Sequence, residues 1–301
     1  MISNSDQYIV VNYHFVLNPE DRPDLGGIFP CLPETFSNQL KWLKKNFTLT
    51  AVDEVYRAAR EKRSGRFCAL TFDDGTRDHL EIVFPLLREQ RAPGTFFVIT
   101  GPFEGKMPTS HKIYRLRSEL TIPELIDHYN NFSRNPMPTD KFIDPTERYD
   151  DLLTSNFKTT IARLPHSVAN EFMNVLFSQL GWDENLEARK LFLMPEDIVK
   201  MKSGGMKFGA HGDSHNPFPV LKDDEVANEL RNSKRILVDL LGEEVHLFSY
   251  PHGQYRRQHP KLIEDFGFHY AATTERRSIN GIENKFLLPR FDANDLKDIQ
   301  K

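Results

Sequence analysis

The chain has 301 residues, of which 39% are hydrophobic and 27% charged, proportions typical of one large folded domain or two smaller ones. Its 43 acidic and 39 basic residues give a net charge of −4, so it lacks the basic excess of a nucleic-acid-binding protein. No apolar run approaches the roughly 18 residues of a membrane span. The two cysteines, Cys31 and Cys68, are too few for a cysteine-rich zinc site. We therefore predict no nucleic-acid partner and no membrane span.

The first seven residues contain neither the basic segment nor the apolar segment of a secretory signal peptide. We therefore expect a cytoplasmic protein. The oligomeric state cannot be read from the sequence.

The N-terminal third alternates between strand and helix patterns. Apolar, β-branched runs predict strands over residues 8–15, 48–52, 67–72 and 95–100. Apolar residues at helical spacing predict helices over residues 33–46, 53–59 and 80–87. This alternation favours parallel strands that are joined by crossover helices.

The alternation breaks over residues 102–194, where no convincing strand pattern occurs. Helical patches recur there, rich in Phe, Leu and Ile, at residues 120–129, 149–164, 167–180 and 186–192. We interpret this segment as a helical insertion within a single domain of residues 1–301. An insertion at the end of a strand in such a fold lies beside the active face.

The alternation resumes after residue 194. Helices are predicted over residues 195–202, 223–241 and 256–266. Strands are predicted over residues 206–210, 245–250, 268–273 and 286–290. A short polar helix is expected to follow the last strand.

The strand pattern at 67–72 ends abruptly in Asp73, Asp74 and Gly75. Two carboxylates this close raise one another's pKa unless a cation neutralises them. The alternative is that these residues only form a turn, for which aspartate and glycine are favoured. The stretch alone favours the turn.

Two histidines, His211 and His215, follow the predicted strand 206–210. Their spacing places both imidazoles on one face if a helical turn begins there. Two imidazoles and one carboxylate form an open site for a divalent ion such as zinc. The alternative is a pair of unrelated surface histidines.

Two further segments follow or contain strand patterns. The loop at 249–255 is fixed by Pro251 and Gly253, so its backbone amides could bind an oxyanion. The loop alone favours the alternative, an ordinary strand-to-helix turn. Near the C-terminus, Arg290 could steer a carboxylate or form a surface ion pair.

These motifs occur together in the order of a known family. TFDDG at 71–75, HGDSH at 211–215, YPHGQY at 250–255 and LLPRFD at 287–292 resemble the motifs of the polysaccharide deacetylase family, the NodB-homology group of carbohydrate esterases. The resemblance covers about residues 8–101 and 195–295, and leaves the helical insertion outside. It implies an α/β fold, a deformed (β/α) barrel of about seven strands with its site at the C-terminal ends of the strands.

The resemblance also implies roles for individual residues. Asp73 would be the general base. The metal ligands would be Asp74, His211 and His215, and the metal most often zinc (Zn²⁺), with Co²⁺, Ni²⁺ or Mn²⁺ as alternatives. The loop residues Pro251, His252 and Tyr255 would hold the substrate and the oxyanion.

The chain departs from the family pattern at three places. Gly212 follows the first metal histidine, where the family often has Ser or Thr. Ser249 and Tyr250 stand where many members carry an arginine that orients the base, so Arg290 is expected to take that role. No histidine follows the Leu-Leu pair at 287–288 to serve as the general acid. The first candidate for the general acid is His14, although a purely structural role for this histidine is an equal alternative. The second candidate is His252.

The expected function is that of a metal-dependent hydrolase of carbon–nitrogen bonds other than peptide bonds. It would remove an N-acetyl or other acyl group from a saccharide or saccharide precursor, in the biosynthesis of a surface polysaccharide. Two alternatives stay open at this point. The chain could hydrolyse a linear or cyclic amide that is not a sugar, or it could be an inactive barrel that only binds a saccharide.

Overall fold

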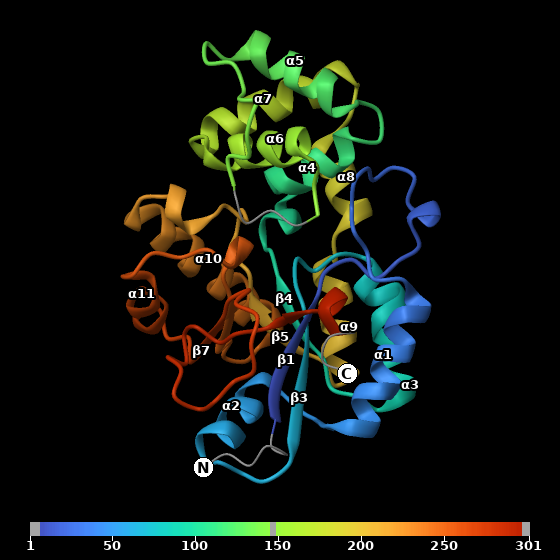
Figure 1. The fold of residues 1–301 in the computed structure, drawn as a ribbon, viewed down its shortest axis with the longest axis vertical. Helices are drawn as coiled ribbons and strands as arrows, with labels where there is room; N and C mark the ends of the chain where they lie inside the picture. Colours follow the sequence, from blue (N-terminus) through green and yellow to red (C-terminus); the bar gives the residue numbers. More distant parts are fainter. Residues whose placement is uncertain (1–6, 145–148, 297–301) are drawn as a thin grey trace.

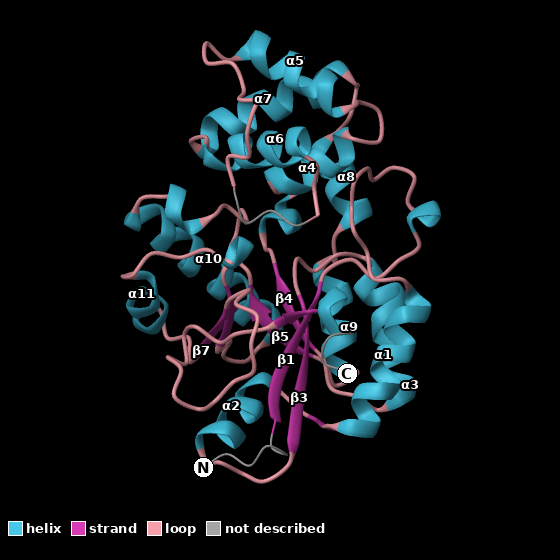
Figure 2. Cartoon of the chain, in the orientation of Figure 1, coloured by secondary structure: helices cyan, strands magenta, loops and turns pink. Residues whose placement is uncertain are grey.

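The computed structural model describes residues 7–144 and 149–296, and its centre is a curled sheet of parallel strands (Figures 1 and 2). The strands follow the order β7-β6-β5-β4-β3-β1-β8, and the short strand β2 pairs with β3. Their bounds are Gln7–Tyr13 (β1), Thr48–Leu49 (β2), Arg66–Phe72 (β3), Thr95–Val98 (β4), Lys207–Ala210 (β5), Leu247–Ser249 (β6), Tyr270–Ala272 (β7) and Phe291–Asp292 (β8). The deformed (β/α) barrel predicted from the sequence is confirmed.

Helices connect successive strands from β1 to β7 and pack around the sheet (Figure 2). Helix α1 shows why they do so, because Phe36, Leu40 and Leu43 form one buried stripe along it. The bounds of the helices are Pro33–Asn46 (α1), Val52–Arg60 (α2), Phe84–Gln90 (α3), Pro195–Ser203 (α9), Asp223–Leu241 (α10) and His259–Asp265 (α11). A π-helical turn, His79–Val83, precedes α3. No helix in the described ranges is both long and apolar enough to cross a membrane.

The register of the strands brings the sequence motifs to one rim of the barrel. Strands β1 and β3 pair over seven residues, from Gln7 with Arg66 to Tyr13 with Phe72, so both end at the same level. The backbone N–H of Asp73 then donates to the Tyr13 carbonyl, 2.9 Å away. Likewise β4 and β5 end together, and the N–H of His211 donates to the Val98 carbonyl at 3.0 Å. Parallel strands that end in register therefore place both motifs at the same edge.

The predicted last strand, residues 286–290, is wrong in its position. Leu288 forms a single bridge with Ala272 of β7, and the paired strand β8 begins only at Phe291, beside β1. The reason is local, because Pro289 has no N–H to donate and the N–H of Arg290 bonds to the Glu275 carbonyl at 2.8 Å. Residues 288–292 therefore cross from one edge strand of the sheet to the other.

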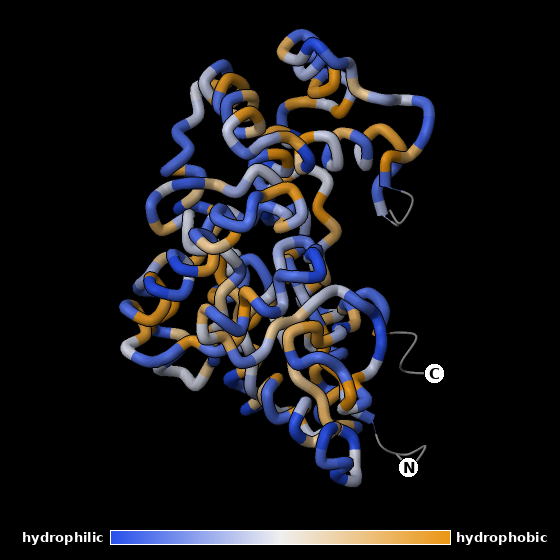
Figure 3. Tube along the Cα trace, turned by 90° about the vertical axis from the view of Figure 1, so that its left-hand side faces the viewer, coloured by the Kyte–Doolittle hydropathy of each residue, from blue (hydrophilic) through white to orange (hydrophobic). Residues whose placement is uncertain are grey.

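Five helices lie beyond the C-terminal ends of the strands, in the upper part of Figure 1. They are Thr109–Leu116 (α4), Ile122–Phe132 (α5), Leu152–Arg163 (α6), His166–Gln179 (α7) and Glu184–Leu191 (α8). Phe157, Phe172 and Leu116 belong to a hydrophobic cluster of their own, and apolar stretches run through this part of the chain as they do through the sheet (Figure 3). The described residues of 102–194, a range we call the helical segment, contain no strand.

Each helical patch predicted in this segment corresponds to a helix, whereas α4 was not predicted. Helix α4 has only eight residues, and four of them, His111, Lys112, Ile113 and Leu116, are buried. Two of these four are polar, so only Ile113 and Leu116 mark its buried side as apolar in the sequence.

Candidate active site

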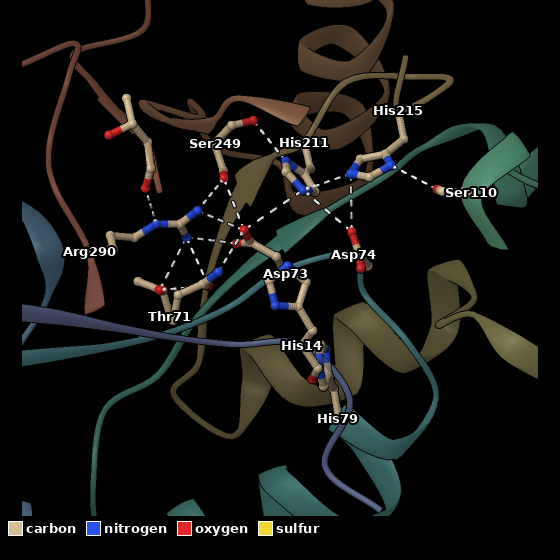
Figure 4. Close-up of polar contacts among 12 residues, drawn as sticks. His14, Thr71, Asp73, Asp74, His79, Ser110, His211, His215, Ser249 and Arg290 are labelled. Atoms are coloured by element: carbon tan, nitrogen blue, oxygen red, sulfur yellow. Dashed lines mark hydrogen bonds and ion pairs between the residues drawn. The ribbon is translucent and has the colours of Figure 1, made fainter. Parts of the chain in front are cut away.

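Asp73 is held by Arg290 at the rim of the barrel. The Nη1 and Nη2 groups of Arg290 donate to Oδ1 and Oδ2 of Asp73 at 2.8 and 2.7 Å (Figure 4). Both residues are almost fully buried, with 1% of Arg290 and 2% of Asp73 exposed. A forked pair of this kind fixes the plane of the carboxylate. The structure therefore places the Arg290 guanidinium directly against the Asp73 carboxylate.

The other donors of Arg290 are also satisfied. Its Nε group donates to the Thr273 carbonyl at 2.9 Å, and its Nη1 group also reaches Asn12 Oδ1 at 3.0 Å and Thr71 Oγ1 at 3.2 Å. Nη2 donates to Ser249 Oγ at 2.9 Å. Asn12 and Ser249 each donate to Asp73 Oδ2 at 3.2 Å.

Asn12, Thr71 and Ser249 of this network were not among the site residues predicted from the sequence. Asn12 gave a usable signal, because it is a polar residue within an otherwise apolar strand and is 4% exposed. A buried amide requires a partner. Thr71 is of a type common in strands, so nothing in the sequence distinguishes it. Ser249 was noted only because it stands where many family members carry an arginine.

The pKa of Asp73 reflects opposing effects. Burial raises it, but the positive charge of Arg290, the interaction with His211 and the hydrogen bonds from Arg290 outweigh burial and hold the pKa below its ordinary value. Asp73 is therefore ionised at neutral pH.

This lowered pKa predicts a pH dependence of stability. A carboxyl whose pKa is lower in the folded state than in the unfolded state stabilises the fold fully above the unfolded value, about 3.9 for aspartate, and loses that contribution as the pH falls through the folded value. In metal-free protein, the difference in free energy of unfolding between wild type and Asp73→Asn should therefore shrink as the pH falls below about 4. Urea titrations at several pH values measure it. A difference that stays constant from pH 6 to the acid limit would contradict the pKa assignment.

Asp74, His211 and His215 turn three potential ligand atoms toward one another (Figure 4). Oδ1 of Asp74 lies 3.4 Å from Nε2 of His211 and 3.3 Å from Nε2 of His215, and the two Nε2 atoms are 3.2 Å apart. All three residues are buried. Asp74 and His215 also adopt left-handed backbone conformations, with φ of 75° and 61°. Strain of this kind is typical of functional sites.

The three residues fit a divalent cation. The Nδ1–H of His211 donates to the Ser249 carbonyl at 2.8 Å, so its Nε2 atom carries a free lone pair. Oδ1 of Asp74 is buried without a hydrogen bond. In a tetrahedral zinc site with bonds of about 2.0–2.1 Å, neighbouring ligand atoms lie about 3.3 Å apart. The spacing of Oδ1 and the two Nε2 atoms matches that edge, and it leaves a position open for water or substrate.

Gly212 is explained by the loop that presents the histidines. Its φ of +80° favours glycine, and an added Cβ atom would lie 3.0 Å from Glu229 Oε2. Glu229, from α10, accepts hydrogen bonds from the N–H groups of Asp213 and Ser214 at 2.6 and 2.9 Å. The substitution of glycine for the usual Ser or Thr therefore follows from the loop conformation.

His14 and His252 approach the site from two loops. His14 follows β1, is exposed, and interacts electrostatically with Asp73 (Figure 4); its carbonyl accepts a hydrogen bond from His79 Nε2 at 2.8 Å. The His252 ring packs on His215 with centroids 4.6 Å apart. Although part of the His252 residue is exposed, desolvation of the ring lowers its pKa to about 4.

The other two residues predicted for the substrate loop lie differently. Pro251 is buried. Tyr255 is 40% exposed, and its ring contacts Tyr250 at a centroid distance of 5.3 Å rather than any of the three metal-ligand candidates. Their predicted roles in holding the substrate and the oxyanion stay predictions.

The helical segment adds a residue that the sequence analysis missed. His111 of α4 is 1% exposed, and its Nε2 atom lies 3.4 Å from Oδ2 of Asp74. The helical segment also forms one wall of a cavity of about 360 Å³, with Ser110, Tyr114 and Lys158 on that side and His215 and His252 on the other. No local pattern identifies His111, because its neighbours come from distant parts of the chain.

Comparison with known proteins supports the fold and the family. The family model described as polysaccharide deacetylase matches residues 60–128 and 142–271, more than half of the chain. No curated protein matches it by sequence. The Streptococcus pyogenes deacetylase PplD, solved with acetate, aligns with a TM-score of 0.62 at 17% identity over 98% of each chain. IcaB from Ammonifex degensii aligns with a TM-score of 0.61 at 15% identity, over 98% of this chain and 95% of that one. The BpsB deacetylase domain from Bordetella bronchiseptica gives 0.55 at 15% identity, over 95% of each chain.

Proposed function

The chain belongs to the polysaccharide deacetylase family, and on this basis we propose that it is a metal-dependent hydrolase that removes an N-acetyl group from a saccharide. Membership of the family makes the chain a hydrolase of carbon–nitrogen bonds. The observation that carries the finer proposal is the pairing of two neighbouring carboxylates with different surroundings. Asp74 faces two histidine lone pairs, whereas Asp73 is held by Arg290.

Asp74, His211 and His215 would hold the cation. Their nitrogen and oxygen donors suit Zn²⁺ best, with Co²⁺, Ni²⁺ and Mn²⁺ as alternatives. When bound, such an ion polarises the acyl carbonyl and lowers the pKa of a water molecule.

Asp73 is proposed as the general base. Its Oδ2 atom lies 3.8 Å from Nε2 of His211, so it faces the place where the acyl carbon would be attacked. Because its pKa is low, Asp73 is ionised and ready to take the proton of the attacking water. Arg290 is a positioning residue, since its guanidinium fixes the direction of that carboxylate.

His14 is proposed as the acid that protonates the leaving amine. It is exposed at the rim, near Asp73, where a leaving group would depart. His252 is less suited to this role, because a pKa of about 4 leaves it neutral at pH 7. The backbone amides of the loop at 250–255 are proposed to contact the oxyanion.

The size and lining of the cavity favour a saccharide over a small amide. At about 360 Å³ it has room for more than an acetyl group. Phe29 and Tyr149 also line it, 52% and 42% exposed, with ring centroids 5.6 Å apart. Exposed aromatic faces of this kind can stack on the apolar face of a sugar ring. We therefore propose that the helical segment is an insertion within a single domain and that it selects an N-acetylated saccharide or saccharide precursor as the substrate. The reaction is proposed to take place in the cytoplasm, as a step in the biosynthesis of a surface polysaccharide.

Removal of the metal should abolish activity. After dialysis against a chelator, acetate release from N-acetylated oligosaccharides is expected to fall to background, and Zn²⁺ or Co²⁺ should restore it. In the Asp74→Asn variant, added Zn²⁺ or Co²⁺ should not restore acetate release, because an amide is a much weaker metal ligand than a carboxylate. Enzymatic detection of acetate and metal analysis provide the readouts.

Two outcomes would overturn this proposal. Full activity in the metal-free protein would exclude the metal centre. The second outcome is a Zn²⁺-loaded protein that hydrolyses small amides or cyclic imides but no N-acetylated sugar. It would show that the substrate is not a saccharide.

A further inference from the structure

Two adjacent residues at the start of α4 lie against the proposed metal ligands. Ser110 Oγ is 3.3 Å from Nδ1 of His215 and 3.2 Å from Nδ1 of His111. Nε2 of His111 in turn faces Oδ2 of Asp74 at 3.4 Å. The pair therefore connects His215 to Asp74 by a route that does not pass through the metal position.

The hydrogens along this route have a single consistent order when His215 binds a cation through Nε2. The proton of His215 must then be on Nδ1, so it is donated to Ser110 Oγ. The Ser110 hydroxyl is free to donate to Nδ1 of His111. His111 then carries its proton on Nε2 and donates it to Oδ2 of Asp74, which leaves Oδ1 of Asp74 as the ligand atom.

The surroundings of His111 hold its ring in this orientation. Its ring packs edge-on against Phe192, with centroids 4.9 Å apart, and lies 6.1 Å from the ring of Phe15. His111 is 1% exposed, and within the described chain its Nε2 atom is buried without a hydrogen-bond partner, 3.4 Å from Oδ2 of Asp74. A buried ring N–H is costly unless it finds an acceptor, and the carboxylate of Asp74 is the acceptor that it faces.

We propose that Ser110 and His111 are positioning residues that fix the ligand atoms of His215 and Asp74. This proposal rests on the metal site of the proposed function and adds the helical segment to it. A hydrogen bond from outside the ligand set orients a metal ligand, and its loss commonly lowers metal affinity 10- to 100-fold. The helical segment would then form part of the metal centre in addition to lining the substrate cavity.

Metal affinity tests the proposal directly. Zn²⁺ dissociation constants of the full chain are measured by competition with a chromophoric chelator, and the Co²⁺ absorption spectrum reports ligand geometry. His111→Phe, which keeps the aromatic packing but removes the donor, should weaken Zn²⁺ binding about 10- to 100-fold. His111→Gln retains a donor and should recover part of that loss. Ser110→Ala should weaken binding as well, and the double variant Ser110→Ala/His111→Phe should lose less than the product of the two effects, since both residues belong to one route.

Matched controls separate positioning from general destabilisation. His259→Gln removes a buried histidine of α11 whose ring packs on Phe218, and Ser155→Ala removes a buried serine of α6. Both should leave the Zn²⁺ dissociation constant unchanged. If His111→Phe does not fold, Ser110→Ala and His111→Gln carry the test.

Folded His111 and Ser110 variants with wild-type Zn²⁺ affinity and an unchanged Co²⁺ spectrum would overturn this inference while leaving the proposed function intact. A wild-type protein that binds neither metal would instead overturn the proposed function.

Discussion

Asp73→Asn is expected to lower kcat for deacetylation by about 10²- to 10⁴-fold, the range typical of a lost general base. An amide cannot take the proton of the attacking water. The Zn²⁺ dissociation constant should stay near that of wild type, because Asp73 is proposed as the base and its carboxylate is held by Arg290. Acetate release under saturating Zn²⁺, together with metal analysis of the same sample, measures both quantities.

Asp74→Asn is the matched comparison, since it makes the same chemical change one residue further along. This variant should lose Zn²⁺ affinity as well as turnover. If both variants lost metal to the same extent, the division of roles between the two carboxylates would be wrong. Thermal unfolding of each variant shows whether either change disturbs the fold.

Arg290→Met is expected to lower the free energy of unfolding by about 3–5 kcal/mol, because it leaves the buried Asp73 carboxylate without its cation. Arg290 is also 1% exposed and bonds to the Thr273 carbonyl and the side chains of Asn12 and Ser249, so these buried groups lose a partner too. Urea unfolding at pH 7 measures the change. Turnover should fall as well, since the base loses its orientation.

Arg57→Met provides the control for this substitution. Arg57 pairs with Asp53 and Glu54 on α2, but its side chain is 53% exposed. Exposed pairs of this kind contribute about 0–1 kcal/mol, so the control should change stability little. Arg290→Lys should restore charge but not the forked geometry, and therefore only part of the stability. An Arg290→Met variant as stable as wild type would show that the pair does not support the fold.

The sequence predicted the barrel well because its signals are local. An apolar run such as residues 67–72 reads as a buried strand without knowledge of its partners, and the acids after it mark the end of that strand. The grouping of Asp73, Asp74 and His211 was implied by the family resemblance, and it agrees with parallel strands that end at one rim. The register of β1 with β3, which ends with Tyr13 opposite Phe72, fixes the position of Asp73 at that rim.

The features that the sequence did not predict depend on contacts between distant residues. The strand expected at 286–290 became a crossing segment because Leu288 bonds to β7 and Phe291 to β1. His111 lies on a helix whose buried side carries only two apolar residues, and what identifies it is its position in the fold, 3.4 Å from Asp74. Asn12 is the instructive exception, because a polar residue in a buried strand can be recognised from the sequence as one that requires a partner.

The crossing segment at 288–292 has a consequence for the order of assembly. Asp73 and its guanidinium partner are 217 positions apart in the sequence. While a chain is being synthesised, the carboxylate emerges long before the arginine that neutralises it, so any earlier compact form must bury an uncompensated charge or keep the rim open to water. The ion pair at the rim can therefore form only after residue 290 has been synthesised. A chain that ends before Arg290 lacks the cation that compensates the Asp73 carboxylate. In the complete chain, the same cation is proposed to orient Asp73 as the general base.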